Sequence, residues 1–239
     1  MYLQFFHLRE APFNLTPDPR FLFLSAPHED ALTHLLYGIH ERKGFIAITG
    51  EVGTGKTLLC RALLERLDHT VATALIFNAY LTTMELLQAI TDDFGVQPGE
   101  PTRKGYVDCL NAYLLEEFAA GRNAVVVLDE AQHLEPAVLE QLRMLSNLET
   151  ARGKLLQIIL VGQPELHAKL ATHQMRQLDQ RIAVRFTMQA LTRTETAQYI
   201  AHRMSVAGAA HTVCWSRRAL GRFALALRPL GVRLDRVTA

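Results

Sequence analysis

Residues 50–57 read Gly50-Glu51-Val52-Gly53-Thr54-Gly55-Lys56-Thr57, with the spacing G-x-x-x-x-G-K-[ST]. A short apolar run at residues 45–48 precedes them, and an amphipathic segment begins at Leu58. Strand, glycine-rich loop and helix in this order form a phosphate-binding loop, where backbone N–H groups and the helix dipole meet the phosphates. The residues expected to bind nucleotide are Gly50, Glu51, Val52, Gly53, Thr54, Gly55, Lys56, Thr57 and Leu58.

Two side chains of this loop have specific chemistry. Lys56 would reach the β- and γ-phosphates, and the Thr57 hydroxyl would ligate Mg²⁺. The alternative is a flexible glycine-rich turn that binds nothing. We favour the phosphate-binding loop because the pattern arises by chance in roughly one chain of this length in a hundred, and its flanks fit a strand and a helix.

The composition is that of an ordinary globular protein. The chain has 239 residues, of which 49% are hydrophobic and 21% charged, with a formal net charge of +1. That length allows one large domain, or one with a small appendage. No run approaches the roughly 20 apolar residues of a membrane-spanning helix, and the N-terminus lacks signal-peptide features. We expect a cytoplasmic protein without a membrane span, peripheral to the inner membrane at most through partners.

Neither the cysteines nor the histidines form a metal-binding pattern. The three cysteines, Cys60, Cys109 and Cys214, are far apart and lack CxxC spacing, so we expect free thiols in a reducing compartment. His28, His34 and His40 recur every six residues. Six residues turn a helix by about 600°, so these side chains would point to different faces and could not share a metal.

Apolar runs and helical patterns alternate along the chain. We expect strands at 45–48, 71–77, 125–128 and 155–161, and helices at 83–94, 107–118 and from 136, with a loop at 96–104. This alternation predicts an α/β fold with a parallel, doubly wound sheet and helices on both faces.

The N-terminal segment has no clear period. It is rich in aromatic residues and proline, and Ser25 could cap a helix that runs to about Gly44. The segment could cover the nucleotide base or plug the edge of the core, and the sequence does not decide between these.

An acidic pair follows the third expected strand. Residues 125–128 are four consecutive apolar residues that favour a central parallel strand, and Asp129 and Glu130 come directly after them. Ligands bind at the C-terminal ends of such strands. We expect Asp129 to hold Mg²⁺ and Glu130 to orient and polarise the attacking water. A solvated acidic turn is the alternative, which the upstream phosphate-binding loop disfavours.

A polar residue ends the fourth expected strand. Gln163 stands between Gly162 and Pro164, where its side chain could touch the γ-phosphate or the attacking water. An ordinary turn residue before proline is the competing interpretation.

The chain resembles the general secretion pathway protein A (ExeA-type) AAA+ ATPases, and transposition-type AAA+ ATPases have a similar core. The matching stretches are PFNLTPDPRFL at 12–22, TGEVGTGKT at 49–57, LDEAQ at 128–132, LSNLET at 145–150, LVGQPEL at 160–166 and LDQRI at 178–182. The resemblance implies a three-layer P-loop NTPase core of the additional-strand type. This core would comprise residues 1–190, with an N-terminal lead-in segment at 1–43, and a small helical lid would follow at 191–239.

The same resemblance implies an activity and a quaternary arrangement. ATP hydrolysis with Mg²⁺ is expected in a homo-oligomer, where an arginine of one subunit completes the site of its neighbour. By motif position that arginine is Arg181, with Arg185 second. A guanidinium suits this task because its fixed charge and planar fork match the developing phosphoryl charge. A secretion or envelope assembly partner is also implied.

The sequence departs from the family pattern in the lid. Thr192 and Glu195 can cap a first lid helix to about residue 207, and residues 216–227 could form a second. The family then has Gly-x-Pro-Arg, whereas this chain has Gly231-Val232-Arg233. The last 25 residues hold six arginines and one acid, a charge of +5, so the rest of the chain carries 1 − 5 = −4. We expect a truncated or altered lid.

Three functions fit these observations. The first is a motor or switch that hydrolyses ATP in type II secretion or cell-envelope assembly. The second is a transposition or target-selection ATPase, which would need a basic surface for nucleic acid and which a core at −4 disfavours. The third is a nucleotide-binding scaffold without turnover, for which the altered lid argues.

Overall fold

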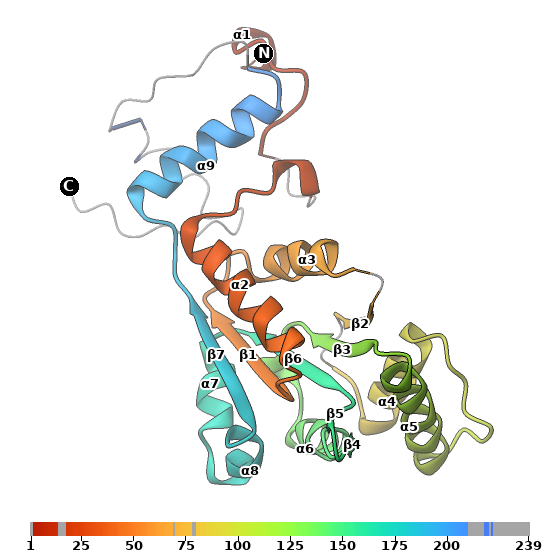
Figure 1. Ribbon diagram of the computed structural model, residues 1–239. Helices are drawn as coiled ribbons and strands as arrows, with labels where there is room; N and C mark the ends of the chain where they lie inside the picture. The colour runs from red at the N-terminus through yellow and green to blue at the C-terminus, as the bar shows by residue number, and fades with distance from the viewer. Residues whose placement is uncertain are drawn as a thin grey trace.

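The computed structural model describes residues 2–13, 18–68, 70–77, 80–209, 218–219 and 221. A five-stranded parallel sheet lies at its centre, with the strand order β2-β3-β6-β1-β7 (Figure 1). The strands are β1 (Phe45–Gly50), β2 (Val71–Ile76), β3 (Asn123–Leu128), β6 (Gln157–Gly162) and β7 (Ile182–Met188). Because β6 lies between β1 and β3, the expected additional strand is confirmed.

Helices cover both faces of this sheet, as Figure 1 shows. One face packs on α2 (Ala26–His40) and α3 (Lys56–Arg66). The other packs on α4 (Thr83–Asp93), α5 (Arg103–Ala119), α6 (Pro136–Leu145), α7 (Pro164–Leu170) and α8 (Arg176–Asp179). The central strands are apolar on both faces because both are buried, and the three-layer α/β fold is confirmed.

The N-terminal segment packs against α9 (Arg193–Val206), outside the three layers (Figure 1). Arg9 N donates to the Ala207 carbonyl at 2.7 Å. The Arg203 guanidinium lies over the rings of Phe13, Phe21 and Tyr199. The segment, which contains α1 (Tyr2–Phe5) and η1 (Pro19–Phe21), thus contacts α9, an arrangement that neither of the two alternatives described.

Several boundaries differ from the expectation. Thr102 accepts a hydrogen bond from Gly105 N and α5 begins at Arg103, before the expected start at residue 107. The Ser25 hydroxyl caps no backbone N–H, although α2 begins at the next residue. The expectation missed β7, α7, α8, the hairpin of β4 (Glu149–Thr150) and β5 (Gly153–Lys154), and the short turns η2 (Ala131–His133) and η3 (His173–Met175).

The region expected to form a lid, residues 191–239, is described only in part. Thr192 and Glu195 form the expected capping box at the start of α9, with hydrogen bonds of 2.8 and 3.3 Å to the two backbone N–H groups. Most of the expected second lid helix, Cys214 and residues 231–233 lie outside the described residues. Within the described residues, no helix is both long and apolar enough to cross a membrane.

Candidate nucleotide-binding site

The glycine-rich stretch forms the turn between β1 and α3. β1 ends at Gly50 and α3 begins at Lys56. Gly53 and Gly55 have φ angles of +79° and +86°, which residues with a Cβ rarely adopt, so both glycines are needed for this path. Val52 is exposed at the tip of the loop, the Thr54 hydroxyl donates to the Glu51 carbonyl, and Leu58 lies in the first turn of α3.

Lys56 points into the loop rather than into solvent. Its side chain is buried, and its Nζ donates to the carbonyl oxygens of Gly50 at 2.8 Å and Glu51 at 3.0 Å. Burial lowers the pKa of Lys56, while Glu130 and Asp129 oppose that shift. A cation held inside a concave loop by neutral carbonyls fits an anionic group such as a phosphate.

Thr57 and Asp129 are in direct contact, although 72 residues separate them. Thr57 Oγ1 donates to Asp129 Oδ2 at 2.7 Å, and Asp129 is buried. Asp129 Oδ1 accepts from Glu130 N at 2.9 Å, which fixes the carboxylate. A hydroxyl and a carboxylate oxygen are hard ligands of the kind that Mg²⁺ prefers, so these two residues fit the expected metal.

Glu130 stands in a constrained turn after β3. Its φ is +53°, a left-handed conformation that is uncommon for a residue with a side chain. Its Oε2 accepts from Gln132 Nε2 at 2.5 Å and from Gln163 Nε2 at 3.3 Å. The structure thus joins Glu130 and Gln163, which the sequence predicted at the tips of two successive strands, because β3 and β6 are neighbours in the sheet.

Opposing effects set the charge of Glu130. Burial by itself raises the pKa of Glu130, but the hydrogen bonds from Gln132 and Gln163 and the charge of Lys56 outweigh it. The net pKa is below the usual value of a glutamate, so the carboxylate is ionised at neutral pH. An ionised, oriented carboxylate can accept a hydrogen bond, and then a proton, from a water molecule.

Gln132 is a site residue that the sequence analysis missed. It is buried, its amide nitrogen donates to Glu130, and its Oε1 accepts from Gln163 N at 3.0 Å. A Cβ on Gly162 would lie 2.7 Å from that same oxygen, so glycine leaves room for the contact. The only sequence signal was its place in the matching stretch LDEAQ at 128–132.

Arg181 is not near the phosphate-binding loop of its own chain. It precedes Ile182, which pairs with Phe45 at the start of β1, whereas the loop begins at the other end of that strand. Five residues of strand put these ends roughly 16 Å apart. The structure therefore keeps Arg181 separate from Lys56 and Glu130.

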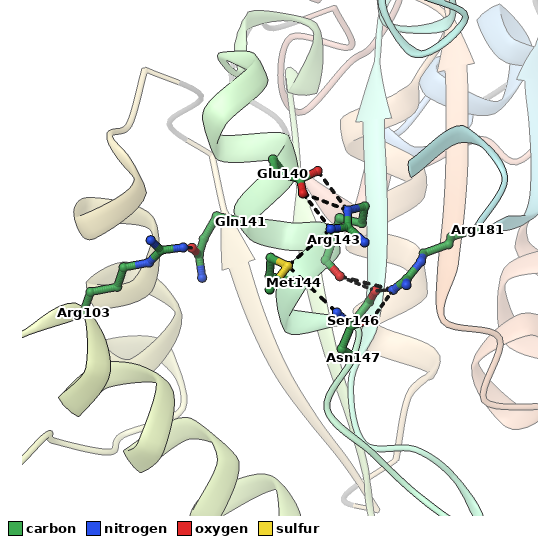
Figure 2. Close-up of polar contacts among 8 residues, drawn as sticks. All are labelled: Arg103, Glu140, Gln141, Arg143, Met144, Ser146, Asn147 and Arg181. Carbon is green, nitrogen blue, oxygen red and sulfur yellow. Dashed lines mark hydrogen bonds and ion pairs between the residues drawn. The ribbon is translucent and has the colours of Figure 1, made fainter. Parts of the chain in front are cut away.

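Arg181 is anchored at the C-terminal end of α6, as Figure 2 shows. Its Nη1 donates to Asn147 Oδ1 at 2.6 Å, to Ser146 Oγ at 2.8 Å and to the Arg143 carbonyl at 3.3 Å. Nε and Nη2 have no hydrogen bond to the described part of the chain. Arg185, by contrast, directs its Nη2 to Asp179, with an ion pair of 2.9 Å.

Comparison with known proteins gives the class that this fold and site define. The family of AAA domains matches residues 39–170, which include the loop at 50–57, the acidic pair and Gln163. The chain therefore belongs to the AAA domain family of P-loop ATPases.

One curated relative matches most of the chain. This is General secretion pathway protein A of Aeromonas hydrophila, which is 46% identical over 209 residues, or 87% of this chain. The resemblance inferred from the sequence is thus confirmed. The match spans only 38% of that relative, so the chain corresponds to a part of it.

Solved structures share the fold at low identity. The ORC2 protein of Aeropyrum pernix, in ADPNP and ADP complexes, superimposes with a TM-score of 0.63 and 19% identity, covering 82% of this chain and 55% of that one. Cdc6p of Pyrobaculum aerophilum gives a TM-score of 0.61 and 18% identity over 80% of this chain and 54% of that one.

Proposed function

We propose that this chain binds ATP with Mg²⁺ and hydrolyses it to ADP and phosphate. The contact between Thr57 Oγ1 and Asp129 Oδ2 is the observation that carries this proposal. It joins the phosphate-binding loop to the acidic pair after β3, which is the arrangement that a metal and a triphosphate require together.

Each residue then has a separate task. The backbone of residues 50–58 and the Lys56 ammonium hold the phosphates, and Thr57 and Asp129 hold the metal. When bound, Mg²⁺ would offset the negative charge of the phosphates. Glu130 would orient a water molecule and accept its proton as the water oxygen bonds to the γ-phosphorus and the bond to the leaving ADP oxygen breaks. Gln163 donates to Glu130, so its side chain would lie near the same water.

We further propose that the active form is a homo-oligomer in which Arg181 completes the site of the next subunit. Its position at the far end of the sheet supports action on a neighbour. Its unshared Nε and Nη2 support it over Arg185, whose guanidinium is paired with Asp179. In this proposal residues 1–190 form the core and 191–239 the lid.

The biological role that we propose is that of a motor or switch for a secretion or cell-envelope assembly on the cytoplasmic side of the membrane. The relationship to General secretion pathway protein A supports this role. The partner that is remodelled would be a component of that assembly.

Steady-state ATP hydrolysis over a range of protein concentrations tests the proposal. We expect specific activity to rise with concentration, because a neighbouring subunit completes each site. Lys56→Ala should abolish activity, and Glu130→Gln should abolish hydrolysis while ATP still binds. Nucleotide binding without turnover at any concentration would instead favour a non-hydrolysing scaffold.

A further inference from the structure

A buried histidine contacts the phosphate-binding loop from the first turn of α2. His28 is only 6% exposed. Its Nε2 lies 3.0 Å from the Thr54 carbonyl oxygen, and its Nδ1 lies 2.6 Å from Ser25 Oγ. In the sequence, the spacing of His28 from His34 and His40 bears only on metal binding, which helix geometry argues against.

The partners of His28 determine where its proton lies. The Thr54 carbonyl can only accept, so Nε2 must carry hydrogen and donate to it. Burial lowers the pKa of His28, which favours the neutral ring. Nδ1 of the neutral ring is then an acceptor, and the Ser25 hydroxyl donates to it. The imidazole is held from both sides in one orientation.

This contact also fixes the peptide between Thr54 and Gly55. In a trans peptide the C=O and the following N–H point in opposite directions, and the described residues contain no cis peptide. Because His28 holds the Thr54 carbonyl, the Gly55 N–H points away from His28. A Cβ on Gly55 would lie 2.7 Å from His28 Nε2, so this approach also requires glycine.

We propose that His28 is a positioning residue of the phosphate-binding loop, which orients the Thr54–Gly55 peptide so that the Gly55 N–H faces the bound phosphates. The proposal rests on the proposed binding of nucleotide. His28 touches neither substrate nor metal in this role. Loss of its donor would let the peptide rotate, and one donor to a charged phosphate would be lost.

Three variants separate this role from a merely structural one. His28→Leu removes the donor, His28→Gln places an amide N–H near the position of Nε2, and His40→Leu removes an exposed imidazole from the far end of the same helix. The readouts are the Kd of a fluorescent ADP analogue with Mg²⁺, which needs no hydrolysis, and the melting temperature without nucleotide.

We expect His28→Leu to weaken binding roughly 10-fold or more, since a hydrogen bond to a charged group has about that effect. His28→Gln should restore the Kd to within about threefold of the wild type, and His40→Leu should not change it. The melting temperature of His28→Leu should fall only slightly, which would show that the variant is still folded.

Several results would overturn the proposal. Wild-type affinity in His28→Leu would show that the contact does not position the loop. Equal weakening by His28→Leu and His28→Gln would show that the donor is not what matters. If His28→Leu does not fold, Ser25→Ala replaces it, because it releases the imidazole on one side; wild-type affinity there would count against the proposal. If the wild type itself does not bind the analogue, the proposed function is refuted. If the wild type binds and only the role of His28 fails, the proposed function stands.

Discussion

Gln132 donates a hydrogen bond of 2.5 Å to the carboxylate of Glu130, and both residues lie in the turn that follows β3. The left-handed backbone of Glu130 folds the chain back, so that a residue two positions later can reach the carboxylate. The same amide accepts from Gln163 N and thereby links two strand tips. Gln132 thus sets both the direction and the ionisation of the proposed base.

Replacing Gln132 by leucine should lower the kcat of ATP hydrolysis by about 10- to 100-fold, because Glu130 would no longer be oriented. The folded-state pKa of Glu130 is lowered, so its carboxylate stays ionised to lower pH than a free glutamate. Without Gln132 that pKa should rise, and the acid limb of the kcat profile should move to higher pH. Measurement of kcat against pH, with nucleotide Kd as control, checks this.

Gln157→Leu is the matched control for Gln132→Leu. It makes the same replacement at a buried glutamine in β6, which lies at the opposite end of the strand from Gln163. It should leave the pH profile of kcat unchanged. An unshifted acid limb in Gln132→Leu would contradict the role assigned to that residue.

Thr57 should affect metal-dependent binding specifically. Thr57→Val removes the hydroxyl that bonds to Asp129 and that would ligate Mg²⁺, whereas Thr57→Ser keeps it. We expect Thr57→Val to weaken ATP binding about tenfold or more in the presence of Mg²⁺ and much less in its absence. Titration of ATP with and without EDTA measures both values. Equal losses in the two conditions would exclude a metal ligand.

Arg181 can be tested by mixing variants. Lys56→Ala subunits lack a working loop but keep Arg181, and Arg181→Ala subunits have the reverse defect. If the arginine acts on its neighbour, the mixture should regain part of the activity that each variant lacks, because an arginine of this kind accelerates hydrolysis by about 10³-fold or more. No recovery at any mixing ratio would argue against action in trans.

Two further variants distinguish the proposed action of Arg181 on a neighbouring subunit from a purely structural role. Arg181→Lys keeps a donor for Ser146 and Asn147 but loses the planar fork, so it should be folded and inactive. Arg185→Ala should retain most activity, since that guanidinium is paired with Asp179. Melting temperatures of both variants show whether a loss of activity reflects a loss of structure.

The sequence predicted the parts of the site that depend on strand order. A phosphate-binding loop after one buried strand and an acidic pair after another must meet at the same edge of a parallel sheet, and Thr57 and Asp129 do so. Gln132 and His28 could not be found in that way. The position of Gln132 depends on the backbone turn at Glu130. That of His28 depends on how α2 packs against a loop residue 26 positions away.

The missed strand has a different explanation. β7 is at the edge of the sheet and, among the described strands, pairs with β1 alone, so its burial is uneven along the strand. Its sequence alternates apolar residues with Arg185 and Thr187 instead of forming a continuous apolar run. A continuous apolar run is the sequence signal of a buried parallel strand, and β7 lacks one.

Replacing Arg203 should weaken the contact between the N-terminal segment and α9. Its guanidinium contacts three aromatic rings, and its Nε donates to the Pro12 carbonyl at 2.5 Å. Arg203→Leu should therefore destabilise this contact by about 1–3 kcal/mol and make the segment before residue 25 easier to cleave. Limited proteolysis followed by mass spectrometry locates the cuts. Arg193→Leu, at the start of the same helix, is the control, and an identical cleavage pattern in the two variants would contradict the prediction.

Gln157 should reduce the stability of the fold. Its side chain is completely buried in β6, and neither its amide nitrogen nor its amide oxygen has a hydrogen-bond partner among the described residues. A buried polar group without a partner loses its hydration and gains nothing in exchange. Gln157→Leu has nearly the same volume and needs no partner, so we expect the free energy of unfolding to rise by about 1–2 kcal/mol. That corresponds to a melting temperature about 2–8 °C higher, measured without nucleotide. A lower melting temperature would instead show that the amide is satisfied in solution by ordered water, which leucine would displace.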